Sequence, residues 1–154
     1  MNGTRTSSVR PPPRGPLARW LPFSARPGAV AEARALTADF LADVGDPLVV
    51  ADAVLLVSEL VGNAVRHTHG PGALLLLRET GHLRIEVTDT SPRPPRPRPP
   101  HDVQEAGGLG LFLLTRLAQH WGWYPLARGK TVWCDLRCPS TDRRRVNRRA
   151  RPLS

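Results

Sequence analysis

A carboxylate and an amide four residues apart, Glu59 and Asn63, have the types and spacing that suit chemistry. If the segment around them is a helix, both side chains project from one face. The Asn63 amide oxygen suits Mg²⁺, a hard cation that prefers oxygen ligands. The Glu59 carboxylate could orient or deprotonate a hydroxyl group or a water molecule. The same pair also occurs on ordinary solvated helix faces, so this interpretation depends on further motifs.

The second motif is Asp89-Thr90-Ser91, which ends an alternating apolar and polar segment and precedes a proline-rich stretch. A carboxylate held at this point could accept a hydrogen bond from the exocyclic amine of adenine. An aspartate at the end of a strand more often caps a turn. The motif therefore gains weight only in combination with the others.

The third motif is the glycine-rich run Gly107-Gly108-Leu109-Gly110-Leu111. Glycines let a backbone approach a phosphate group, and a helix that begins there offers free N–H groups and a positive dipole end. The run is not a Walker A loop, because no Lys-Ser/Thr pair follows. It is not a dinucleotide fingerprint either, because it follows a long loop rather than a strand. Alone, such a run is more often a hinge.

Hydrophobic periodicity predicts the helices and strands that must position these residues. Asp46-Pro47 has the pattern of an N-cap followed by proline at the first helical position. The expected helices cover residues 27–44, 47–67 and 108–120, and the expected strands cover 17–23, 73–79, 82–90, 121–126 and 130–137. Residues 91–107 contain six prolines between Pro92 and Pro100, which predicts a long loop.

Composition divides the 154 residues into one foldable domain, expected at 17–138, and two tails. Residues 1–16 are rich in Pro and Arg, residues 139–154 are rich in Arg, and both tails are expected to be disordered. Residues 1–27 and 139–154 each carry a net charge of +5, whereas 28–138 carries −1. The overall charge of +9 therefore belongs to the tails, which makes nucleic-acid binding by the domain an unfavoured reading.

Several features favour a cytoplasmic protein. Cys134 and Cys138, if they lie on one strand, are about 13 Å apart at roughly 3.3 Å per residue, too far for a disulfide. Reduced thiols are typical of the cytosol. No secretory signal begins the chain, and no apolar run approaches the ~20 residues of a membrane span, so no membrane association is expected.

The three motifs in this order resemble the N, G1 and G2 boxes of the GHKL superfamily of histidine kinase-like ATPases. The residues concerned are V-S-E-L-V-G-N-A-V-R-H, D-T-S and G-G-L-G-L-F-L-L, with 26 residues from Asn63 to Asp89 and 19 from Asp89 to Gly108. W-G-W-Y and G-K-T-V-W-C-D-L resemble the end of the small bacterial anti-sigma-type domains. The resemblance spans about residues 17–137 and implies the Bergerat-type ATP-binding fold. That fold is an α/β (α+β) two-layer sandwich whose mixed, mostly antiparallel sheet has helices on one face.

The resemblance also implies roles on the phosphate side of an ATP site. Asn63 would hold Mg²⁺, and Glu59 would be the general base. Arg66 and His67 follow the Asn box and would line the phosphate side. Leu109 and Leu111 belong to the run in which Gly108 and Gly110 would form the phosphate-facing edge of the ATP lid and its helix.

Around the base, the resemblance implies three further residues. Asp89 would read adenine, and Thr131 matches a threonine that lies near the adenine in such domains. Ser91 stands where the superfamily's usual D-x-G has glycine, so a small residue is kept at this point.

The resemblance implies a free-standing anti-sigma-factor serine/threonine kinase, which would phosphorylate a small antagonist protein. Its partners would be that antagonist, a sigma factor or both, and the related kinases suggest a homodimer. No dimerisation helix or phospho-acceptor histidine box precedes the domain, and no transducer domain follows it. Those expectations argue against a sensor kinase and against a gyrase- or MutL-like motor. Two alternatives stay open: an ATP-binding interaction module without catalysis, and a nucleic-acid binder that acts through its arginine tails.

Overall fold

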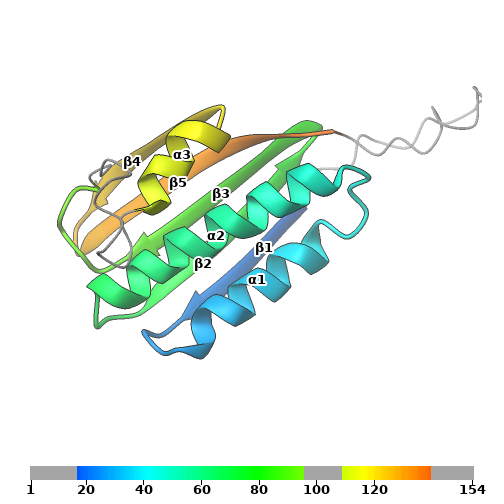
Figure 1. Ribbon diagram of the computed structural model, residues 1–154. Helices are drawn as coiled ribbons and strands as arrows, with labels where there is room; N and C mark the ends of the chain where they lie inside the picture. Colours follow the sequence, from blue (N-terminus) through cyan, green and yellow to red (C-terminus); the bar gives the residue numbers. More distant parts are fainter. Residues whose placement is uncertain (1–16, 96–108, 140–154) are drawn as a thin grey trace, which may run out of the picture.

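The computed structural model describes residues 17–95 and 109–139, which form a sheet with helices packed on one of its faces (Figure 1). The expected tail 1–16, most of the loop 91–107, Gly108 and all but the first residue of the tail 139–154 lie outside the described residues. The elements in chain order are β1 (Leu17–Phe23), α1 (Gly28–Phe40), α2 (Pro47–His67), β2 (Gly72–Glu79), β3 (Gly81–Asp89), α3 (Leu109–Leu117), β4 (His120–Leu126) and β5 (Gly129–Cys138).

The five-stranded sheet has the order β1-β2-β3-β5-β4. Every pairing between neighbouring strands in the described part of the chain is antiparallel, so the sheet contains none of the parallel pairing that a mixed sheet would have. The expected two-layer α+β sandwich, with three helices on one face of a mainly antiparallel sheet, is confirmed (Figure 1).

The core lies between α2 and the middle of the sheet. Strand β3 alternates between a buried and a half-buried side, and Leu83, Ile85 and Val87 are its buried apolar residues. On α2, helical spacing gathers the buried residues into one stripe. These residues are Ala53, Leu56, Val57, Leu60, Val61 and Ala64. The helical and strand periodicities of the sequence thus place apolar side chains on the facing surfaces of α2 and the sheet, and these side chains form the core.

Helix α2 begins as predicted. The Asp46 side chain accepts a hydrogen bond of 3.0 Å from the backbone N–H of Leu48, and Pro47 occupies the first helical position. Both features stabilise the start of a helix, since they satisfy or remove N–H groups that lack an intrahelical partner.

Two helix ends differ from the predicted ones. Helix α1 ends at Phe40 rather than at residue 44, because the chain tightens into turns in which the N–H of Ala42 bonds Asp39 and that of Val44 bonds Leu41. Helix α3 ends at Leu117 rather than at residue 120. The next residues join the sheet, and His120 pairs with Asp135 on β5.

By length and composition, α2 could also cross a membrane, since its 21 residues include a window of mean hydropathy 1.9. Asp52 and Glu59 interrupt this helix, so it contains no unbroken apolar run of about 20 residues, as expected from the sequence. The same apolarity is what a central core helix requires, because α2 packs against α1, α3, β3 and β5.

Candidate functional site

The Glu59–Asn63 pair lies on α2, and both side chains are half-buried. Their spacing of one helical turn places them on one face, as the sequence predicts. The Asn63 amide oxygen accepts a hydrogen bond of 2.9 Å from the Arg66 guanidinium, which runs back along the helix past Gly62. The oxygen that would bind a cation is therefore held by a cationic side chain from the same helix.

Arg66 and His67 are exposed at the carboxyl end of α2. Cationic groups are favourable there because they face the negative end of the helix dipole. Arg66 is thus one of the predicted site residues that the structure brings directly to Asn63.

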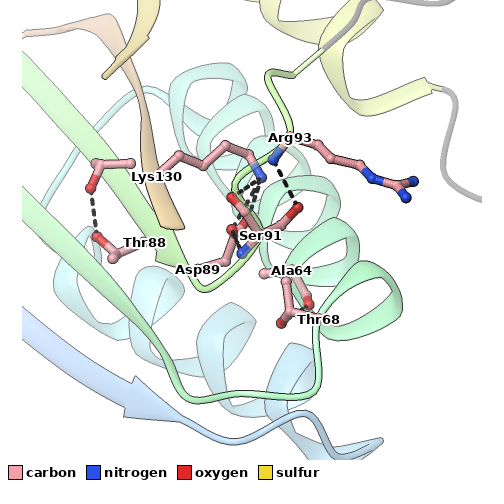
Figure 2. A network of polar contacts seen from close by, with 8 residues as sticks. Ala64, Thr68, Thr88, Asp89, Ser91, Arg93 and Lys130 are labelled. Atoms are coloured by element: carbon pink, nitrogen blue, oxygen red, sulfur yellow. Dashed lines mark hydrogen bonds and ion pairs between the residues drawn. The ribbon is translucent and has the colours of Figure 1, made fainter. Parts of the chain in front are cut away.

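The turn after α2 packs against Thr90, the residue that follows β3. A Cβ atom on Gly70 would lie 2.6 Å from the Thr90 side chain, so a larger residue here would require the Thr90 side chain to move. Thr68 directly follows α2, and its hydroxyl group donates to the Ala64 carbonyl oxygen over 2.6 Å; Figure 2 shows this pair together with Asp89 and Ser91. The helix that carries Glu59 and Asn63 packs against β3, the strand that ends in Asp89.

Asp89 is 7% exposed, and its carboxylate has partners on both oxygens. The backbone N–H of Ser91 donates to Oδ1 over 2.8 Å, which is the turn-capping geometry of an aspartate at a strand end. Lys130 Nζ donates over 3.1 Å to Oδ1 and over 3.0 Å to Oδ2 (Figure 2). Ser91 contributes further through its hydroxyl oxygen, which accepts from the backbone N–H of Arg93 over 3.3 Å.

Lys130 is a site residue that the sequence analysis missed. It lies opposite Asp89 in the β3–β5 register and is also 7% exposed. The signal that could have found it is its uniqueness, since it is the only lysine in the chain. A lysine is seldom buried without a partner, and here the partner is the residue that the sequence singled out.

Thr131 is placed differently from its neighbour. It lies opposite Thr88, and the two hydroxyl oxygens are 2.8 Å apart. Successive side chains on a strand point to opposite faces, so the face that carries Asp89 and Lys130 is not the face that carries Thr131. The side chain that contacts the Asp89 carboxylate is therefore that of Lys130 and not that of Thr131.

Gly129 makes the approach of β5 to Asp89 feasible. It has a φ of +129°, and a Cβ atom built on it would lie 1.9 Å from the Asp89 carbonyl oxygen. Only glycine adopts this backbone without strain and leaves the space free. The sequence predicts strands at 121–126 and 130–137, and the structure adds that the glycine between them places Lys130 against Asp89.

The glycine-rich motif is described only in part. Leu109 and Gly110 form the beginning of α3, whereas Gly108 lies outside the described residues. The Leu111 side chain is buried in the hydrophobic core, so it fastens α3 to the domain. Its place in the motif is therefore structural.

Comparison with known proteins gives three results. The family model of the histidine kinase-like ATPase domain matches residues 23–134. No curated protein matches. Among solved structures, one similar chain is the crystal structure of the RsbU and RsbW domains of Rv1364c from Mycobacterium tuberculosis. It shares 25% sequence identity with a TM-score of 0.58, over 82% of this chain and 33% of that one.

This chain thus spans about a third of that solved structure. The family match covers well over half of the chain and includes Glu59, Asn63, Asp89 and Lys130. Motif order, sandwich architecture and family match agree, and the chain belongs to the histidine kinase-like ATPase domain family.

Proposed function

We propose that this protein binds ATP with Mg²⁺ and is a serine/threonine kinase of the anti-sigma-factor type, acting in the cytoplasm. The observation that carries the proposal is the packing of the helix that carries Glu59 and Asn63 against the strand that ends in the buried Asp89, inside a domain of this family. Similarity to a protein with an RsbW domain supports the anti-sigma direction. The two free, buried cysteines support the cytoplasmic assignment.

The residues of the site fit Mg²⁺ by their chemistry. Within the described residues, no group of three or more His, Cys, Asp or Glu side chains could hold a metal ion by itself. Mg²⁺ suits such a site, because it is often bound through one or two protein oxygens plus substrate phosphates and waters. Asn63 would hold the ion through its amide oxygen, and the ion would offset negative charge on the phosphates.

The side chains of the chain itself supply the remaining steps. Asp89 accepts a hydrogen bond from the exocyclic amine of adenine. Glu59 orients or deprotonates a Ser or Thr hydroxyl of an antagonist protein, and that oxygen attacks the γ-phosphorus while the bond to the β-phosphate oxygen breaks. The new phosphate then weakens partner binding through like charge and desolvation. A sigma factor and a second copy of this chain are the further partners we propose.

The first test is calorimetric titration of ATP, with and without Mg²⁺, into the wild type and Asn63→Ala. We expect binding that depends on Mg²⁺ in the wild type, and at least about tenfold weaker binding in Asn63→Ala, because one charge-bearing contact is lost. Absence of ATP binding by the wild type would contradict the proposed function.

The kinase step has its own test, which uses γ-labelled ATP and small proteins encoded beside this gene. We expect label on a Ser or Thr of one of them, and no label when Glu59→Gln replaces the wild type. Glu59→Gln should still bind ATP, because the carboxylate acts on the hydroxyl and not on the nucleotide. Retained transfer by this variant would remove Glu59 from its role.

One observation favours a second function, an ATP-binding interaction module that transfers no phosphate. Both polar groups that would bind the nucleotide already have internal cationic partners, Arg66 on Asn63 and Lys130 on Asp89. A module of this kind would bind ATP in the titration but would transfer no label to any candidate protein.

A further inference from the structure

The Asp89–Lys130 pair offers more hydrogen-bonding capacity than a lone carboxylate. An ionised carboxylate has about four acceptor positions, and an ammonium group has three N–H donors. Oδ1 already accepts from the Ser91 N–H and from Nζ, whereas Oδ2 accepts from Nζ alone. One acceptor position therefore remains on Oδ2.

The ammonium group keeps one weakly used donor. Two N–H groups of Lys130 point at the carboxylate oxygens, and the next oxygen within reach, the Ser91 carbonyl, lies at the long distance of 3.5 Å. The pair thus places a free acceptor and an available donor about 3.0 Å from each other. Each side chain keeps only 9% of its surface exposed, so a ligand there is largely out of water.

A donor beside an acceptor matches more than one purine. Adenine presents an amine donor at position 6 and an acceptor nitrogen at position 1. Guanine and hypoxanthine present the reverse, a carbonyl acceptor at position 6 and an N–H donor at position 1. A carboxylate alone, which only accepts, suits the adenine amine and repels the 6-oxo group.

We propose that Lys130 is a base-specificity residue that lets this site take 6-oxopurine nucleotides, GTP and ITP, as well as ATP. The Lys130 ammonium donates to the 6-oxo group while Asp89 Oδ2 accepts from the N–H at position 1. With adenine the same two groups exchange roles, so that Oδ2 accepts from the amine and Nζ donates to the ring nitrogen. The inference rests on the proposed function, in which a nucleotide base binds at Asp89.

The geometry holds Lys130 where it can serve this role. Gly129 brings the beginning of β5 against Asp89, and the β3–β5 register sets Lys130 directly opposite. Because this site is buried, a polar group of the protein or the base that finds no hydrogen-bond partner weakens binding strongly. Such unmatched groups are the usual origin of strong selectivity.

The test compares the dissociation constants of ATP, GTP and ITP, measured by titration in Mg²⁺ for the wild type, Lys130→Met and Arg84→Met. ITP isolates the 6-oxo group because it lacks the 2-amino group of guanine. Arg84→Met is the matched control, since Arg84 pairs with Asp135 away from this site. We expect the wild type to bind all three within about tenfold, and Lys130→Met to weaken GTP and ITP at least about tenfold more than ATP.

A second readout needs no variant. Because Lys130 is the only lysine, protein labelled with ¹⁵N-lysine gives one side-chain ammonium resonance, which ATP and ITP should shift to different positions. An ATP preference well above tenfold in the wild type, an unchanged ratio in a folded Lys130→Met, or a resonance that neither nucleotide moves would overturn the inference. If ATP still binds in any of these outcomes, the proposed function is unaffected and only the role of Lys130 is lost. If none of the three nucleotides binds the wild type, the proposed function and the inference on Lys130 both fail.

Discussion

At the scale of single residues, the two groups proposed to bind the nucleotide, Asn63 and Asp89, already have partners within the chain. The Asn63 oxygen accepts from Arg66, and the Asp89 carboxylate accepts from Lys130. Among the described residues, no buried side-chain nitrogen or oxygen lacks a hydrogen-bond partner. A nucleotide must therefore share or exchange these contacts, so its affinity depends on the cations Arg66 and Lys130 as much as on the groups they contact.

The same scale includes an ion pair on β3 and β5 that is separate from the site. Arg84 binds Asp135 through Nε and a second guanidinium nitrogen at 2.8 and 2.9 Å, and its guanidinium lies 4.4 Å from the centre of the Trp133 ring. The hydrogen bonds from Arg84 lower the pKa of Asp135 below its ordinary value, against the opposing effect of burial. We therefore expect the contribution of this ion pair to the free energy of unfolding to depend on pH.

We expect Asp135→Asn to lower the free energy of unfolding at pH 7 by about 1 kcal/mol, a modest value because the Arg84 side chain is 35% exposed. A carboxyl whose pKa is lower in the folded than in the unfolded protein stabilises above its unfolded pKa, about 3.9. That stabilisation is lost as the pH falls through the folded pKa. Urea unfolding from pH 7 to pH 3 should show the difference between wild type and variant shrinking below about pH 4; a constant difference would mean that the ion pair is not its source.

At the scale of elements, three of them build the site: α2 carries Glu59 and Asn63, β3 ends in Asp89, and β5 begins with Gly129 and Lys130. Two glycines lie in close contact where these elements meet: Gly70 against the Thr90 side chain, and Gly129 against the Asp89 backbone. The chemistry of the site is thus set partly by residues without side chains.

We expect Gly129→Ala to destabilise the domain by at least about 2 kcal/mol, since alanine is strained at a φ of +129° and its Cβ would overlap the Asp89 carbonyl oxygen. The matched control is Gly81→Ala, which has a φ of +78° but no neighbouring atom within 4 Å, and should cost about 1 kcal/mol. Chemical denaturation of both variants measures the difference. Equal losses would show that the contact with Asp89 adds nothing to the backbone strain.

At the scale of the whole molecule, the helices cover one face of the sheet, and the end of α2, the end of β3 and the beginning of β5 lie at the same end of this sandwich (Figure 1). The domain is close to neutral, whereas the sequence outside it is strongly basic. The positive charge therefore lies outside the folded domain, so its effect on binding can be tested by removing the segments that carry it.

We expect a fragment of residues 17–139 to show no measurable affinity for duplex DNA, since its net charge is close to zero. Any affinity of the full chain should fall steeply between 50 and 200 mM salt, as counterion release requires. Fluorescence anisotropy with a labelled duplex distinguishes the two. DNA binding by the fragment would support the hypothesis that the domain itself binds nucleic acid.

Much of the fold could be predicted from local pattern. The alternation of Leu83, Ile85 and Val87 predicts a half-buried strand, and Asp46-Pro47 predicts the beginning of α2; both are confirmed. The ends of α1 and α3 could not be predicted in this way. Leu41 and Val44 are apolar and buried although the helix has ended, and His120 is recruited to β4 by pairing with a distant strand.

By itself the sequence determined most helices and strands, because their periodicities are properties of neighbouring residues. The order of its motifs carried the resemblance that implied the fold class and the family. Only the tertiary structure decided that Lys130 rather than Thr131 stands against Asp89, and that Arg66 holds Asn63. The first choice depends on the register between β3 and β5, where a shift of one residue exchanges the two faces of a strand. Asp89 and Lys130 are 41 residues apart, so no local pattern carries that information.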